Sequence, residues 1–345
     1  MLKTTKARYT IDYSISLDTQ ALSYIQRYIE TGSRYVTSDF SEAFKIIADP
    51  YVNIDPSPYL MENLFNNKTS HDQLFSNFKY YEILRNIDYD HYKKTGVVKS
   101  NLSSNEIISA TQGTLSNIFY KHSQIKIQHT VSSVYCLLLK LSIIQLKNPK
   151  QGIKKKIISF IDFCHNELST HFTGIYLVAI EYFKRGNDLK FFSAIQLSNK
   201  PESLTEKYRK LSDKLKNMSW DLWHAYNLQS LPTILNYRAD YFIGGILTFD
   251  KGLGEILEIL SLHCLVYSNG NMPLPFYSNE KMINFENIIG SEYIQSKYFS
   301  ENATEERNKN RAQSIKNQSQ TIETIEQELI DILKAHIITN DIKAH

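Results

Sequence analysis

Two β-rich segments, far apart in the sequence, each end at an aspartate that leads into a helix, and this feature constrains the fold most. Residues 9–18 alternate in part between apolar and polar side chains, as in a strand that ends at Asp18. Residues 239–249 indicate a helix end or turn that leads into a short buried strand at 246–249, and Asp250 follows directly. Strands that each lead into a helix usually pair in parallel. The sequence therefore predicts an α/β fold with a small central parallel sheet flanked by helices.

Helical patterns dominate the rest of the chain. Nearly the whole stretch 70–217 has helical periodicity, and only 12 Gly and 8 Pro in 345 residues agree with long helices. A helix at 252–262 and a short buried strand at 264–267 suggest a further parallel unit. Residues 268–310 are polar and predicted to be rich in loops, and 321–338 form an amphipathic helix after a polar linker.

The charge of the chain is nearly balanced. There are 39 basic and 36 acidic residues, which gives a net charge of +3. A nucleic-acid-binding domain often has a clear basic excess, so any basic surface here must be local, as at 154–156 or 207–216.

Cysteine usage and hydropathy indicate a cytoplasmic protein. Cys136, Cys164 and Cys264 are odd in number and widely spaced, so we expect small buried side chains and no disulfide framework. No apolar run follows the basic N-terminus, so no signal peptide is expected. The longest apolar stretch, 134–146, is interrupted by Lys140, so no transmembrane helix and no membrane partner are expected.

Asp18 and Asp250 are the strongest candidates for chemistry. Ligands of open α/β sheets bind beyond the carboxyl ends of the strands. If the two strands are neighbours, the two carboxylates converge and repel each other unless a cation lies between them. Magnesium prefers such hard oxygen ligands together with substrate phosphate.

Four short segments resemble the motifs of the PIN-like nuclease family, in the order of that family. Asp18-Thr19 after a strand is similar to its opening motif, and Tyr59-Leu-Met-Glu62-Asn is similar to its helical glutamate. Trp220-Asp221-Leu-Trp-His resembles its third motif, an acidic residue that opens a helix. Leu247-Thr-Phe-Asp250-Lys-Gly resembles its last acidic motif.

The resemblance implies a division of the chain. Residues 1–69 and 218–300 would form a PIN-like nuclease core, and 70–217 would be a helical insertion. Residues 301–345 would form a polar linker and the C-terminal amphipathic helix.

The resemblance also implies phosphodiester hydrolysis with Mg²⁺ or Mn²⁺ held by catalytic carboxylates. Asp18 and Asp250 would bind the metal directly, Asp221 would complete the ligand set, and Glu62 would bind metal or orient the attacking water.

Four further residues would support these carboxylates. Thr19 and Thr248 would hydrogen-bond the carboxylates, and Lys251 or His224 would meet the scissile phosphate.

Each acidic residue also has a purely structural interpretation. Asp18 and Asp250 could be N-caps, Asp221 could complement a helix dipole, and Glu62 could be a solvated helix residue.

Two functions follow from these observations. The first is a metal-dependent endoribonuclease of toxin or antiviral-defence type, which acts on RNA, with single-stranded DNA as the alternative substrate. The second is a non-catalytic, mainly helical protein-binding module with a degenerate nuclease core, which Gln20 and the low net charge favour. In either case the insertion and the C-terminal helix could bind a protein partner or a second copy of the chain.

Overall fold

The computed structural model describes residues 10–65, 70–121, 124–193, 195, 202–230, 239–266 and 274–344. The chain forms two compact units, which are described separately. Unit 1 comprises Met1–Gln128 and Tyr226–Asp250, and unit 2 comprises His129–Ala225 and Lys251–His345. These boundaries differ from the predicted ones, because residues 70–128 pack with the N-terminal segment.

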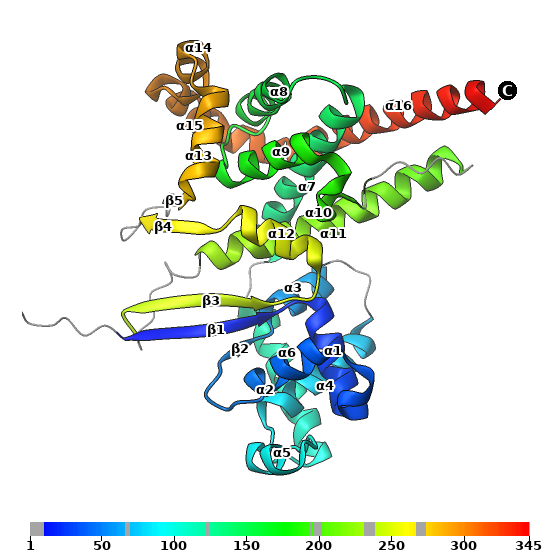
Figure 1. Ribbon diagram of the computed structural model, residues 1–345, viewed down its shortest axis with the longest axis vertical. Coiled ribbons are helices and arrows are strands. Elements are labelled where there is room, and N and C mark those ends of the chain that lie inside the picture. The colour runs from blue at the N-terminus through cyan, green and yellow to red at the C-terminus, as the bar shows by residue number, and fades with distance from the viewer. Residues whose placement is uncertain are drawn as a thin grey trace, which may run out of the picture. The chain divides into compact units, whose positions relative to one another are not determined.

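Unit 1 contains a three-stranded parallel sheet with the order β2-β1-β3, in agreement with the predicted class (Figure 1). The strands are β1 (Ile11–Leu17), β2 (Ile54–Asp55) and β3 (Tyr241–Leu247). The pairing of β1 with β3 runs from Ile11 opposite Tyr241 to Leu17 opposite Leu247. The turn predicted before residue 246 is wrong, because these aromatic and β-branched residues pair along the full length of β1.

Six α-helices surround or extend this sheet. They are α1 (Thr19–Thr31), α2 (Ser38–Ile47), α3 (Ser57–Phe65), α4 (His71–Arg85), α5 (Tyr89–Thr95) and α6 (Ser104–Lys121), with a 3₁₀ turn η1 (Gly32–Tyr35) after α1. Helix α1 ends at Gly32, which has a φ of 69°, a conformation that favours glycine.

An aromatic core lies under the carboxyl end of the sheet. Phe40 stacks with Tyr24 at a centroid distance of 5.3 Å and lies 5.4 Å from the ring of Phe249, which follows β3. Leu17 at the end of β1 is fully buried in the same cluster. This packing fixes the ends of β1 and β3 against α1 and α2.

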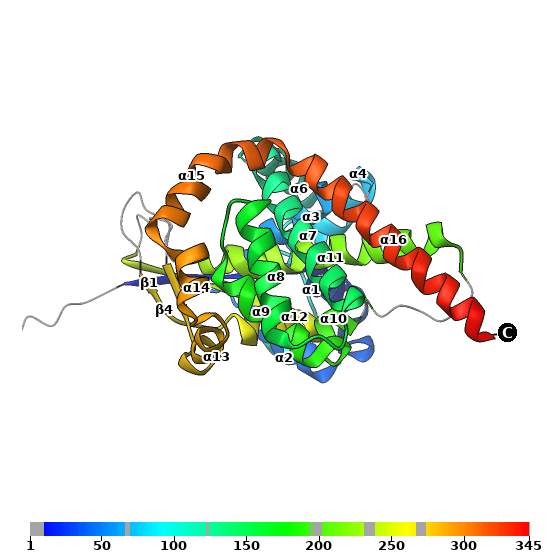
Figure 2. The same cartoon turned by 90° about the horizontal axis from the view of Figure 1, so that it is seen from above.

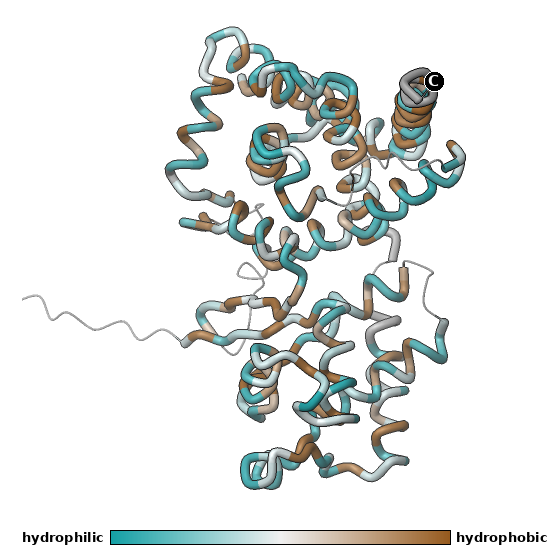
Figure 3. The backbone as a smooth tube through the Cα atoms, turned by 45° about the vertical axis from the view of Figure 1, so that its right-hand side comes forward, coloured by the Kyte–Doolittle hydropathy of each residue, from teal (hydrophilic) through white to brown (hydrophobic). Residues whose placement is uncertain are grey.

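Unit 2 is mostly helical. Its elements are α7 (Gln124–Lys147, which begins at the end of unit 1), α8 (Ile153–Asn166), α9 (Thr173–Arg185), η2 (Gly186–Asp188), α10 (Lys190–Ser193), α11 (Leu204–Ser230), α12 (Lys251–Ile259), β4 (Leu262–Val266), β5 (Leu274–Tyr277), α13 (Asn279–Ile289), α14 (Glu292–Ile294), η4 (Gln295–Phe299), α15 (Glu301–Lys316) and α16 (Gln318–Ala344). Figure 2 shows α15 and α16 following each other along one flank of α8 and α9. Hydrophobic residues recur along the helices of both units (Figure 3).

Three predictions for this part of the chain are wrong. The strand predicted at 264–267 is β4, which pairs antiparallel with β5 in a separate sheet and does not extend the parallel one. The region 268–310, predicted to be loops, contains α13, α14, η4 and most of α15. The segment predicted as a polar linker forms α15. The sequence did not indicate this helix, because a helix with little apolar surface has no amphipathic pattern. The predicted end of the strand at residue 267 lies outside the described residues.

The predicted amphipathic C-terminal helix is confirmed. Ile325, Leu329 and Leu333 of α16 are buried. Cys136 and Cys164 are buried as expected, whereas Cys264 in β4 is exposed, which corrects the prediction for that residue.

The segment Ile127–Lys147 of α7 is long and apolar enough to cross a membrane by length and composition. The sequence argument excluded it because of Lys140. Buried residues make up 61% of its most apolar window, and the core helix of a soluble protein meets the same criterion.

Candidate active site

Asp18 lies where β1 ends and α1 begins, at the carboxyl edge of the parallel sheet. Its backbone N–H donates to the Leu247 carbonyl of β3 at 3.4 Å, and its carboxylate accepts the Ala21 N–H at 2.6 Å. The side chain therefore caps α1, as the structural interpretation expected.

The surroundings of Asp18 disfavour the ionised form of its carboxyl group. The residue is 7% exposed. Burial raises the pKa of its carboxyl, hydrogen bonds from Thr248 and the Ala21 backbone lower it, and the negative charge of Asp250 raises it again, with a net increase from 3.8. The main opposing contributions come from hydrogen bonds and not from a lysine or arginine. The ionised form of Asp18 is therefore opposed by burial and by the charge of a second carboxylate, Asp250.

Thr248 connects the two aspartates. Its side chain hydrogen-bonds Asp18, and its hydroxyl oxygen accepts the Asp250 N–H at 3.0 Å. One hydroxyl therefore donates to the first carboxylate while it fixes the backbone of the second. This matches the predicted role of Thr248 as a hydrogen-bond partner of a carboxylate.

Glu62 joins the same edge through Thr19. The Thr19 hydroxyl donates to the Glu62 carboxylate at 2.6 Å, from the first residue of α1 to the interior of α3. Glu62 is half-buried. The structure thus places Glu62 beside the residue that follows Asp18, so the interpretation of Glu62 as a freely solvated side chain does not apply.

Asp55 is a further carboxylate that sequence reasoning missed. It is the last residue of β2, opposite Ser16 of β1, whose hydroxyl donates to it at 3.3 Å. Its other oxygen accepts the Ser57 N–H at 3.0 Å. The only available signal was an aspartate between an apolar residue and a helix start, as at Asp18.

The remaining predicted residues belong to unit 2. Asp221 lies inside α11 rather than at its first turn, which corrects the expectation that it opens a helix. No Gly or Pro precedes it within Leu204–Ser230, so the helix continues through it. Lys251 is the exposed first residue of α12.

His224 of α11 is unsuited to contact phosphate as a cation. It is 2% exposed between the rings of Trp220 and Trp223, and burial lowers its pKa to about 3. Its ring is therefore neutral near pH 7 and enclosed, which corrects the predicted role.

Carboxylate oxygens such as those of Asp18 and Asp250 are the type of ligand that a hard divalent cation prefers. Among the residues that the structure describes, no group of three or more His, Cys, Asp or Glu side chains is arranged to hold a metal ion. The pair Asp18 and Asp250 is a smaller set, of the kind that Mg²⁺ uses together with water and substrate phosphate. A cation between them would remove the repulsion that raises the pKa of Asp18.

Comparison with known proteins adds no family to this description: no family model, curated protein or solved structure matches the chain.

Proposed function

We propose that the protein is a metal-dependent phosphodiester hydrolase, with RNA as its substrate class. The observation that supports this most is the convergence of Asp18 and Asp250 at the carboxyl edge of a parallel sheet, where the ionisation of Asp18 is opposed by burial and by its neighbour. Such a pair is costly to maintain unless a divalent cation is bound for part of the working cycle.

Each residue of the sheet edge then has a role. Asp18 and Asp250 would hold Mg²⁺ or Mn²⁺, and Thr248 would position both aspartates through its two hydrogen bonds. Glu62, held by Thr19, orients the water that attacks phosphorus. When bound, the metal supplies an activated water and neutralises charge on the phosphate.

The PIN-like resemblance and the cellular role are part of the same proposal. The order of the acidic motifs and the parallel sheet support a PIN-like core that is interrupted by a helical insertion. The roles of Asp221 as third ligand and of Lys251 as phosphate contact stay predictions from the resemblance. A toxin or antiviral-defence role in the cytoplasm, activity on single-stranded DNA, and a partner or second copy bound through the helices rest on analogy alone.

A cleavage assay tests the proposal. End-labelled single-stranded RNA and DNA are incubated with the full chain and Mn²⁺, with and without EDTA. We expect RNA cleavage that EDTA abolishes and that Asp250→Asn reduces by about 100-fold or more, since a catalytic metal contributes several kcal/mol to the barrier. Asp72→Asn, on the exposed first turn of α4, is the matched control and should cleave like the wild type. Equal activity of both variants would contradict the proposal.

One observation favours a second candidate, the non-catalytic binding module. The Asp18 carboxylate already accepts from Ala21 and Thr248, so capping alone accounts for its position. Thermal unfolding with Mn²⁺ separates the two. The hydrolase predicts a rise in Tm that Asp18→Asn abolishes, and the binding module predicts no rise.

A further inference from the structure

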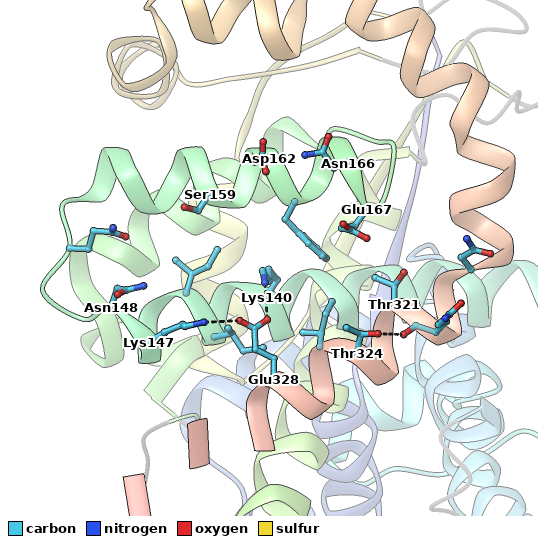
Figure 4. Close-up of a pocket in the computed structure, with 17 residues that line it drawn as sticks. Lys140, Lys147, Asn148, Ser159, Asp162, Asn166, Glu167, Thr321, Thr324 and Glu328 are labelled. Carbon is cyan, nitrogen blue, oxygen red and sulfur yellow. Dashed lines mark hydrogen bonds and ion pairs between the residues drawn. The ribbon is translucent and has the colours of Figure 1, made fainter. Parts of the chain in front are cut away.

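Unit 2 contains a cavity of about 680 Å³ that the carboxylate site does not use. It lies between α7, α8 and the α15–α16 junction (Figure 4). In Figure 4, Ser159 and Asp162 of α8 lie across an open space from Lys140 and Lys147 of α7. Sites for small molecules usually have volumes of about 300–1,000 Å³, so the cavity is large enough for a nucleotide-sized ligand.

One end of the cavity is cationic. Lys140 and Lys147 both contact the Glu328 carboxylate of α16, with N–O distances of 2.9 Å and 3.4 Å. Two ammonium groups share one carboxylate, so this end keeps one positive charge. The Lys147 side chain is 60% exposed, and an ammonium group has three donors, so it can bind another anion.

The rest of the lining suits a neutral, ring-containing group. Apolar surface comes from Ile143, Ile144, Phe163 and Ile325. Amide and hydroxyl groups surround it, and they can both donate and accept hydrogen bonds. They belong to Asn148, Gln151, Ser159, Asn166, Asn317, Gln320, Thr321 and Thr324. Such amides pair readily with the edges of bases.

Of the two acidic groups opposite, Asp162 does not cancel the cationic end. Asp162 accepts from the Tyr298 hydroxyl at 2.6 Å and from Lys297 at 3.1 Å, so its charge is already balanced. Glu167 extends toward the cavity from the end of α8 (Figure 4). Its carboxylate only accepts, which suits the amino and hydroxyl donors of a nucleoside.

We propose that this cavity binds a nucleoside monophosphate or a phosphorylated ligand of similar size, with the phosphate on Lys140 and Lys147. Glu328 occupies the place of the phosphate in the absence of ligand and competes with it. Binding then weakens the contact of α16 with α7, because both lysines leave Glu328. The proposal does not depend on the hydrolase activity.

Calorimetric titration of the full chain in EDTA tests this proposal. The probes are AMP, GMP, CMP and UMP, with inorganic phosphate as the comparison. We expect at least one nucleotide to bind more tightly than phosphate. Lys147→Met should weaken that binding by about tenfold or more, which corresponds to one charge-assisted hydrogen bond. Glu328→Gln should tighten it, because the competing charge is gone.

Lys150→Met is the matched control, since Lys150 is exposed, lies outside the cavity lining and carries the same charge. It should bind like the wild type. The proposal is overturned if no nucleotide binds either the wild type or Glu328→Gln, if phosphate binds as tightly as every nucleotide, or if the two lysine variants behave alike.

Discussion

Asp18 has two separable effects at the end of β1. Its carboxylate caps α1 through the Ala21 N–H, while burial and then the charge of Asp250 oppose its ionisation. Asparagine caps a helix about as well as aspartate, and alanine cannot cap it. Asp18→Asn should therefore keep the cap and remove the charge, whereas Asp18→Ala removes both.

The two variants should change the free energy of unfolding by different amounts. Loss of an N-cap costs about 1 kcal/mol, and a buried donor without an acceptor costs about 1–3 kcal/mol. In Asp18→Ala the cap is lost and the Thr248 hydroxyl loses its acceptor, so the free energy of unfolding should fall by about 2–4 kcal/mol. Asp18→Asn keeps acceptors; it loses the attraction between charge and helix dipole, about 0.3–1 kcal/mol, but it also removes the larger opposition from burial and from Asp250.

The difference in stability between the wild type and Asp18→Asn also depends on pH, and the direction of the pKa shift gives its sign. Because the pKa of Asp18 is raised above 3.8, the folded protein keeps this proton to higher pH than the unfolded chain does. The stability of the wild type should therefore fall relative to Asp18→Asn as pH rises from 3.8 through the folded pKa. At pH 7 the asparagine variant should have gained stability against the wild type.

Urea unfolding between pH 4 and 7 measures these differences. Hydrogen exchange of a peptide that covers α1 assigns them to unit 1, because two compact units need not unfold together. Equal losses for the asparagine and alanine variants, or a difference that does not change with pH, would refute the reasoning.

Three further predictions concern contacts in both units. Thr19→Val removes the 2.6 Å hydrogen bond to Glu62 and should cost about 1–2 kcal/mol, and in a double-mutant cycle Glu62→Gln should add little to it. Leu329→Ala in the fully buried face of α16 should lower unfolding free energy by about 2–5 kcal/mol, whereas the exposed Ile338→Ala should stay within about 0.5 kcal/mol. Burial raises the pKa of Glu328, but two lysines outweigh it and hold the pKa below 4.5. The wild type should therefore be more stable than Glu328→Gln above pH 4.5, and this difference should disappear as the pH falls. Thermal unfolding measured as a function of pH tests this prediction.

The start of the sheet was predictable because its signals are local. The change of period at Asp18 marks the end of β1 and the start of α1, and Gly32 marks the end of that helix. β2 could not be predicted, because two residues carry no periodicity and become a strand only by pairing with Ile15 and Ser16. Helix α15 was missed because a polar surface helix has little amphipathic pattern.

The candidate site was predictable where sequence position alone fixes geometry. Asp18 and Asp250 follow parallel neighbouring strands, so the topology brings them to one edge. The roles predicted for Asp221 and His224 depended on where a helix begins and how deeply its side chains are buried. Neither property follows from a short motif. Asp55 was missed because its strand was missed.

The most direct test of a cation between Asp18 and Asp250 is anomalous diffraction from crystals grown with Mn²⁺. The account predicts a manganese peak with oxygen atoms of both carboxylates within about 2.1 Å, as for Mg²⁺, and its loss in Asp250→Asn. Manganese bound only elsewhere, with nothing between these two side chains, would contradict it.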